Sequence, residues 1–243
     1  CALPIYYGLD VFFRSVHKFN ETVRQEEILL RLEAGQSLAL ISDAGMPALS
    51  DPGSALIRAV HEKAFPIRVI PGPTAVATAW SLAAPDAIEF SFMGFLPTKG
   101  KERSEVLNAM AESTRPCLFY EAPHRVVKTL EDLAQMGLGE RPIFYAREMT
   151  KTYEEFQWAD VKDQLDYFKQ VPPKGEFVFL LDKPGEKEAA KEASEDFLET
   201  EDQVKQLLEE GLSTKDILAR LKGQTLMSKN DLKALIQEIK NKG

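Results

Sequence analysis

The chain has 243 residues, 44% of them hydrophobic and 28% charged, a composition typical of a folded globular protein with one large domain or two modest ones. A formal net charge of −8 excludes an overall positive field that attracts nucleic acid, so an RNA partner requires a local basic patch. No apolar run is long enough to cross a membrane. The two cysteines and three histidines show no zinc or disulfide spacing, which predicts no metal and a cytoplasmic location.

The beginning of the chain has an unusual composition. It starts with Cys1 rather than Met, and no signal peptide follows. We expect residues 1–5 to be a non-native addition joined to a truncated gene.

The first predicted unit combines a helix, a strand and a long loop. Residues 19–34 predict a helix that begins after Asn20. The apolar run 38–41 predicts a buried parallel strand. The loop that follows leads to a helix over 52–64, with Asp51 as its N-cap and a proline in its first turn.

A second unit repeats this order. Residues 66–70 predict a strand, residues 71–75 a Pro-Gly-Pro loop, and the following residues a helix that ends at Ala84. Two successive strand–loop–helix units predict a parallel sheet.

The second half of the α/β region also alternates strands with helices. Strands are predicted at 90–96, 116–120, 142–146, 152–159 and 175–181. Helices are predicted after the stretch 97–103 to about residue 112, from the segment 121–125 to residue 136, and at 161–169.

The acidic segment 183–203 reads as a partly helical linker. Three short helices follow at 201–210, 214–222 and 229–241, with Ser213 and Ser228 as the N-caps of the last two. Their spacing resembles a helix-turn-helix, and a plain dimerisation or stabilising module fits it equally well.

The loop between the first predicted strand and helix is the strongest candidate for a ligand site. In open α/β folds, ligands bind beyond the carboxyl ends of parallel strands, and plain turns seldom need this length. Neither this loop nor the one at 71–75 contains a P-loop or a dinucleotide-binding glycine pattern. The two loops therefore suit a ligand held by backbone contacts and shape.

Several ordered stretches resemble the tetrapyrrole-methylase superfamily, and in particular its branch that methylates small-subunit ribosomal RNA. They are residues 40–53, 70–75, 94–101, 119–125, 146–151 and 174–178. The resemblance runs from about residue 17 to residue 181.

This resemblance implies a two-domain α/β fold with a cofactor cleft and a small C-terminal helical domain. It implies S-adenosylmethionine as cofactor, 2′-O-methylation of a cytidine in 16S rRNA of the small ribosomal subunit, and a homodimer. The expected division is an N-terminal cofactor domain at 6–87, a second α/β domain at 88–183, a linker at 184–203 and the helical domain at 204–243. The family's first strand and its loop are not found before Tyr6, so we expect the cofactor domain to be incomplete.

The resemblance also assigns cofactor-binding residues. One side of the site consists of Ser42, Asp43, Ala44, Gly45 and Pro47, and the other of Gly72, Pro73, Thr74 and Ala75. A sulfonium ligand gains from nearby oxygen atoms, and adenosine from backbone donors and an apolar slot. Plain helix initiation is the alternative role of Gly72 and Pro73.

Methyl transfer to a ribose hydroxyl needs a positioned acceptor and a group that removes its proton. The candidates for this group are Glu121, His124, Glu148 and Lys151. A structural role at the start of a helix is equally compatible with His124.

Lys99, Lys101 and Arg103 form a compact basic group that suits RNA phosphates, although such groups are usually only solvated. Arg125 and Arg147 are expected to clamp phosphate or to stabilise the structure.

Two other functions remain open at this point. A tetrapyrrole C-methyltransferase acting on a precorrin has the same superfamily signature. A non-catalytic RNA- or ribosome-binding protein follows if an incomplete cofactor domain abolishes cofactor binding.

Overall fold

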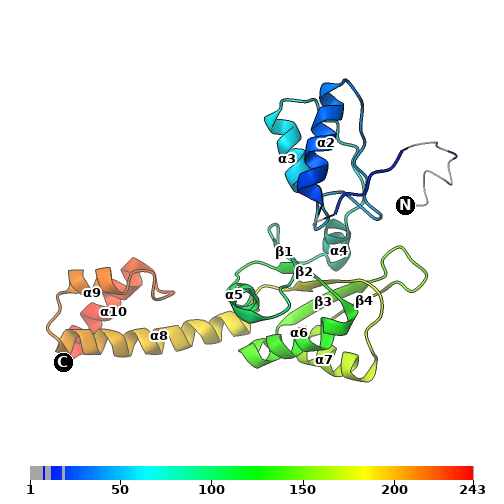
Figure 1. Cartoon of the computed structure of the whole chain (residues 1–243). Helices are drawn as coiled ribbons and strands as arrows, with labels where there is room; N and C mark the ends of the chain where they lie inside the picture. The colour runs from blue at the N-terminus through cyan, green and yellow to red at the C-terminus, as the bar shows by residue number, and fades with distance from the viewer. Residues whose placement is uncertain (1–7, 9–11, 18–19, 243) are drawn as a thin grey trace. The chain divides into compact units, whose positions relative to one another are not determined.

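A computed structural model describes residue 8, residues 12–17 and residues 20–242, so that the segment 1–5 lies outside the described residues. The chain divides into two compact units, Cys1–Asp182 and Lys183–Gly243 (Figure 1). No helix of the described part is long and apolar enough to cross a membrane.

A five-stranded sheet organises the first unit. Its strands are β1 (Ser91–Phe95), β2 (Cys117–Glu121), β3 (Pro142–Arg147), β4 (Glu155–Asp160) and β5 (Phe177–Leu181). They lie in the order β1-β2-β5-β3-β4. Only the β1–β2 pairing is parallel, and the other three pairings are antiparallel. The predicted strands of the second half are therefore confirmed within a few residues.

Helices cover both faces of this sheet (Figure 1). One face packs against α5 (Gly100–Ala111), α6 (Val126–Leu133) and α7 (Val161–Gln170). The other face packs against α4 (Ala75–Ala83). Because successive strand residues point to opposite faces, Phe119 lies in the α5–α7 core, whereas Leu118 lies in the α4 core. The mixed α/β fold is thus confirmed.

The predicted parallel sheet of the first half is wrong for this structure. Residues 38–41 and 66–70 lie in the described part of the chain, but neither segment is assigned as a strand. The exposed fractions of Leu38, Ile41 and Ile70 are 46%, 51% and 86%. A strand is stabilised by hydrogen bonds to a neighbouring strand, and neither segment has such a neighbour among the described residues.

Helices α2 (Glu21–Glu33) and α3 (Ser54–Glu62) lie against each other, and one carboxylate joins them. Oε1 of Glu21 accepts bonds from the backbone N–H groups of Gly53, Ala55 and Leu56, at 3.1, 3.2 and 3.3 Å. Glu21 therefore caps α3 in place of the predicted Asp51, whose carboxylate accepts a bond from the Ser42 hydroxyl.

The second unit is helical. It contains α8 (Glu186–Glu209), α9 (Thr214–Arg220) and α10 (Lys229–Lys242). Its core contains Val204, Leu207, Ile217, Leu221, Leu232 and Ile236. The predicted caps are confirmed, since Ser213 Oγ accepts from Asp216 N at 3.3 Å and Ser228 Oγ accepts from Asp231 N at 3.2 Å. The predicted linker segment lies largely within α8.

Candidate active site

The two glycine loops that the sequence singled out meet in the structure. A Cβ atom added to Gly45 would lie 3.1 Å from the backbone oxygen of Pro73. A Cβ atom on Gly72 would lie 3.3 Å from Sδ of Met46. Glycine at both positions therefore lets the loops at 42–53 and 71–75 touch. We call these two touching loops the cradle, and its residues Gly45, Gly72 and Pro73 are all exposed.

The first of these loops contains residues in the left-handed region of backbone conformation. Gly45 and Gly53 have φ values of 74° and 129°, which glycine adopts at low cost. Ala48 and Ser50 also have positive φ values, 64° and 65°, in the left-handed region that L-residues rarely adopt. Such strain is typical of sites where the backbone is held in place for a ligand.

The second loop has a more regular role. Thr74 is the N-cap of α4, and its Oγ1 accepts a bond from Ala77 N at 3.3 Å. Helix initiation, the alternative role of Gly72 and Pro73, is therefore present together with the contact between the loops.

The sheet contributes one aromatic residue that the sequence reasoning missed. Burial raises the pKa of the Tyr120 phenol, the negative charge of Asp51 raises it further, and the backbone of Val76 opposes the rise. Tyr120 therefore faces both the first loop and the start of α4. Strand alternation could have found it, since Leu118, two residues earlier, packs against α4.

Three further motifs meet at one end of the sheet. Glu121 of β2 and Arg147 of β3 are both in register with Phe177, the first residue of β5. Residues 119–125, 146–151 and 174–178 are therefore neighbours, as expected if all of them serve one site.

Glu121 nevertheless lies on the wrong face of the sheet for contact with the glycine loops. Its exposed fraction is 1%. It accepts bonds from the Thr129 hydroxyl at 2.6 Å and from Ala122 N at 2.9 Å, and it pairs with Arg125 at 3.1 Å. The position of Glu121 in the strand alternation directs its side chain to α6, away from the glycine loops.

Glu148 and Lys151 form a closed ionic cluster. Glu148 accepts from Glu176 N at 3.0 Å and pairs with Lys151 at 3.1 Å, and Lys151 also pairs with Glu176 at 3.1 Å. The Glu176 amide and then Lys151 lower the pKa of the Glu148 carboxyl. Glu176 and then Glu148 raise the pKa of Lys151. A carboxylate with a lowered pKa and an ammonium with a raised one both accept protons poorly near neutral pH.

His124 has a different environment from the other three catalytic candidates. It is exposed, and its side chain makes no hydrogen bond or ion pair with the described residues. It lies in the short 3-10 turn Pro123–Arg125, directly after β2.

Arg125 and Arg147, which were expected to bind phosphate or to stabilise the structure, both have partners within the protein. Arg125 donates to the backbone oxygens of Leu96 and Pro97 at 2.5 and 3.2 Å. Arg147 forms an ion pair with Glu155 of β4. Both side chains therefore stabilise the sheet edge.

The predicted basic group at 99–103 is divided by the fold. Lys99 and Lys101 are exposed, but Arg103 is only 8% exposed. Arg103 donates to Asp132 at 2.7 Å, to the Thr129 hydroxyl at 3.0 Å and to the Pro97 oxygen at 2.9 Å. The expectation of an exposed cluster of all three cations is wrong for Arg103, which joins α5 to α6.

Replacing Arg103 by lysine should lower the free energy of unfolding by about 1–2 kcal/mol, because an ammonium group cannot reproduce the planar set of donors. Lys101→Met removes an exposed pair with Glu105 on the same helix and should cost less than about 0.5 kcal/mol. Denaturant unfolding of both variants measures the difference. Equal stabilities would contradict a structural role of Arg103.

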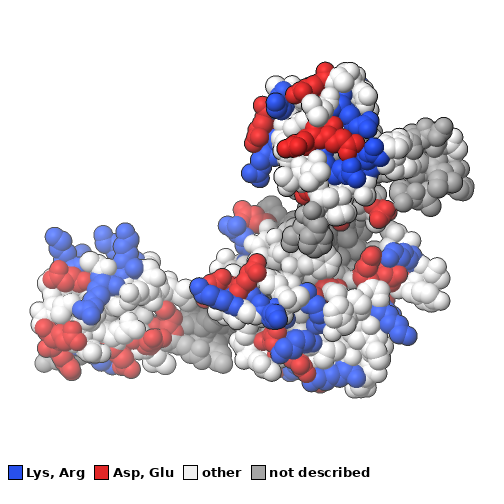
Figure 2. All heavy atoms as spheres, viewed as in Figure 1, with Lys and Arg blue, Asp and Glu red and all other residues white. Residues whose placement is uncertain are grey.

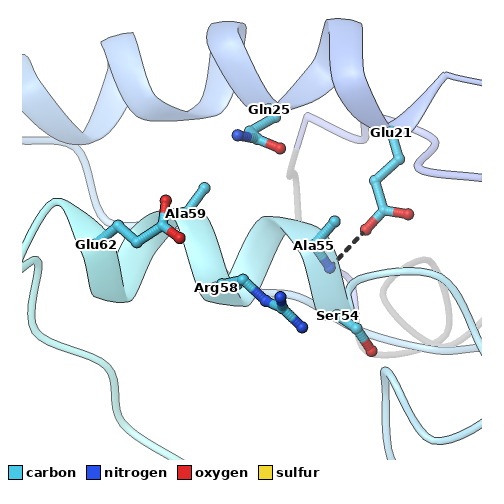
Figure 3. Close-up of a pocket in the computed structure, with 7 residues that line it drawn as sticks. All are labelled: Glu21, Gln25, Ser54, Ala55, Arg58, Ala59 and Glu62. Atoms are coloured by element: carbon cyan, nitrogen blue, oxygen red, sulfur yellow. Dashed lines mark hydrogen bonds between the residues drawn. The ribbon is translucent and has the colours of Figure 1, made fainter.

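An open groove lies elsewhere, between α2 and α3 (Figure 3). It has a volume of about 540 Å³. Figure 3 shows Glu21 reaching across it to Ala55 at the first turn of α3. Because that carboxylate already binds the turn, and the groove contains none of the glycine-loop residues at 42–47 or 71–75, we assign it no ligand.

These features define an α/β protein in which two glycine loops touch beside its sheet. A family model described as Tetrapyrrole (Corrin/Porphyrin) Methylases matches residues 12–166. The chain belongs to this family and is a methyltransferase by class.

Relatives of known name indicate which branch of the family the chain resembles. The chain is 34% identical over 229 residues to "Ribosomal RNA small subunit methyltransferase I" of Synechocystis sp., with 94% of this chain and 81% of the relative covered. It is 38% identical over 180 residues to the protein of the same name from Escherichia coli O157:H7, with 73% of this chain and 63% of the relative covered. The chain therefore spans less than two thirds of some of these relatives.

Solved structures support the fold. The crystal structure of the methyltransferase CobJ matches with a TM-score of 0.53 at 20% identity, covering 72% of this chain and 75% of that one. The crystal structure of diphthine synthase matches with a TM-score of 0.56 at 13% identity, covering 75% and 72%. Proteins with different names thus share this architecture.

Proposed function

We propose that the chain transfers a methyl group from S-adenosylmethionine to the ribose 2′-hydroxyl of a cytidine in 16S rRNA. The observation that carries this proposal is the contact between the loops around Gly45 and Gly72, in a chain whose relatives at 34–38% identity are named as ribosomal RNA methyltransferases. Tetrapyrrole methylation is not favoured, because CobJ is only 20% identical and its likeness supports the fold alone.

The residues of the cradle fit an S-adenosylmethionine molecule. Exposed backbone at Asp43, Ala44 and Gly45 offers carbonyl and amide groups on one side, and residues 72–75 offer the other. The Ser42 hydroxyl donates to the Ala44 oxygen at 3.1 Å and also binds Asp51, which fixes the first loop. When bound, the cofactor supplies an electrophilic methyl group on a sulfonium ion. The cradle holds it through shape and oxygen atoms rather than through a phosphate site.

His124 is our candidate for the group that removes the hydroxyl proton. An imidazole nitrogen can accept a proton, and the His124 side chain has no protein partner among the described residues. Glu121 is buried, while Glu148 and Lys151 hold each other in their charged forms. Glu121, Glu148 and Lys151 are therefore better suited to a structural role, holding this end of the sheet in place.

His124→Ala should lower kcat about 100-fold or more with little change in the KM for S-adenosylmethionine, since general-base catalysis contributes roughly 10²–10⁴-fold. His124→Gln keeps the polarity without a titratable ring and should be equally slow. An unchanged kcat in both variants would assign proton removal to another group.

Substrate contacts follow from the exposed cations. Lys99 and Lys101 lie in the loop before α5 and in its first turn, and both are proposed to contact RNA phosphate. The homodimer and the cytoplasmic location remain predictions from the sequence, and light scattering measures the first.

The deciding experiment supplies methyl-labelled S-adenosylmethionine with 30S subunits, with protein-free 16S rRNA and with a precorrin. Label in a 2′-O-methylcytidine of the RNA supports the proposal. Label in the precorrin would instead support the tetrapyrrole enzyme. Binding of RNA without cofactor binding, measured by calorimetry, would support a non-catalytic RNA-binding protein.

A further inference from the structure

The two last helices concentrate positive charge in an otherwise acidic chain. Residues 211–240 contain six Lys or Arg and three Asp or Glu, whereas residues 186–210 contain three basic and ten acidic residues. Figure 2 shows blue side chains gathered over one side of this unit and most of the red ones over the other. Positive and negative side chains are therefore separated within this unit. Its positive side contrasts with the net negative charge of the whole chain.

The cations of this region are exposed and uncompensated. They are Lys215, Arg220, Lys222, Lys229, Lys233 and Lys240. Within the described part of the chain, none of the six forms an ion pair, whereas Lys205 of α8 pairs with Glu201 and Asp202. Several exposed lysines of the sheet unit are also paired, as Lys128 is with Asp132. An unpaired cation keeps its full attraction for an external anion.

Three of these lysines line one side of α10. Lys229, Lys233 and Lys240 are four and seven residues apart, which corresponds to one and two helical turns. We call these three residues the basic stripe. It extends over roughly 16 Å at 1.5 Å per residue, long enough to meet several consecutive phosphates.

The packing behind the stripe keeps it in place. Leu232 and Ile236 of α10 are buried in the core of the unit. Lys240 Nζ donates to Thr214 Oγ1 at 2.8 Å, which ties the end of the stripe to the first turn of α9, next to Lys215. Asp216 and Asp231 accept bonds from the Ser213 and Ser228 hydroxyls, so these acids serve the helix starts.

We infer that the basic stripe is an RNA-binding surface that contacts the phosphate backbone of the ribosomal substrate. The inference rests on the proposed function, which supplies the polyanion. The stripe lies outside residues 12–166, which the methylase family model matches, so it adds a second anchoring surface to that of the methylase unit. Because contacts to the phosphate backbone carry no sequence information, the stripe contributes affinity rather than sequence choice.

The test compares two triple variants of the full chain with equal loss of charge. Lys229→Gln, Lys233→Gln and Lys240→Gln remove the stripe. Lys128→Gln, Lys162→Gln and Lys169→Gln remove three exposed lysines that pair with Asp132, Glu140 and Glu131. Affinity for protein-free 16S rRNA and for 30S subunits is measured by fluorescence anisotropy over a range of salt concentrations.

The stripe variant should bind both RNA samples at least about tenfold more weakly, and its slope of log K against log salt should flatten by roughly two, because each lost phosphate contact removes about 0.7–0.9. The control variant should keep the parent slope. Calorimetric binding of S-adenosylmethionine and the melting temperature should be unchanged in both variants.

Equal losses in the two variants would overturn the inference, because net charge alone would then explain them. Weaker binding of the stripe variant to 30S subunits but not to protein-free RNA would also overturn it, in favour of an acidic ribosomal protein. If the parent methylates 16S rRNA and the stripe variant keeps its salt slope, the inference fails while the proposed function stands. If the parent neither binds nor methylates RNA, both fail.

Discussion

Replacing Gly45 by alanine should lower the affinity for S-adenosylmethionine at least about tenfold, equivalent to roughly 1.4 kcal/mol. Two costs add at this position. The residue has a φ value of 74°, which is unfavourable for alanine, and the new methyl group would lie 3.1 Å from the Pro73 oxygen. The two loops are thereby pushed apart. Because neither loop belongs to the sheet, circular dichroism should show a folded protein.

Gly35→Ala is the matched control for this experiment. Gly35 has a φ value of 80°, but an added Cβ atom would meet nothing within 4 Å. The control therefore imposes the backbone cost without crowding the cradle, and its cofactor affinity should equal that of the parent. Titration calorimetry measures both variants. Normal binding by the Gly45 variant would show that the cradle is not the methyl-donor site.

The second large effect is expected at Gly175, where alanine should lower the free energy of unfolding by about 3 kcal/mol. The φ value of Gly175 is 85°, and an added Cβ atom would lie 2.5 Å from Cγ of Glu148. Relief requires Glu148 to swing away and to lose its bonds to Lys151 and to the Glu176 amide. Denaturant unfolding measures the cost.

Gly137 provides the control, because its φ value is also 85° and an added Cβ atom would meet nothing within 4 Å. Gly137→Ala should cost only about 1 kcal/mol, the backbone part of the effect. In a chain that already carries Glu148→Ala, Gly175→Ala should cost no more free energy of unfolding than Gly137→Ala does, because the clashing side-chain atoms are gone. Additive effects of the two substitutions would refute the steric explanation.

The sequence predicted the sheet of the second half well because its strands are short apolar runs with partners in the same chain. For example, β2 pairs with β5 along its whole length, from Cys117 opposite Leu181 to Glu121 opposite Phe177. The segments 38–41 and 66–70 are equally apolar, but apolarity alone does not make a strand. Pairing requires a neighbouring strand, and this property cannot be read from the segment itself.

The candidate site was predicted in part, and its errors concern the direction of side chains. Arg103, Leu107 and Met110 are all buried on α5, at spacings of four and three residues, so helix periodicity could have placed Arg103 in the core. Strand alternation could likewise have separated Glu121 from Tyr120. Contact between the glycine loops was expected from the family resemblance, because no local pattern encodes an approach between distant turns.

Glu21 has a consequence for ligand choice. The amino end of a helix ordinarily attracts phosphate through its free N–H groups and its dipole. In this chain the first turn of α3 is already bound by an internal anion, immediately after the strained loop. Nucleotides such as ATP would have to displace that anion to use the turn, whereas a positively charged sulfonium compound has no need of it. The chain's own carboxylate therefore disfavours phosphate binding at the start of α3.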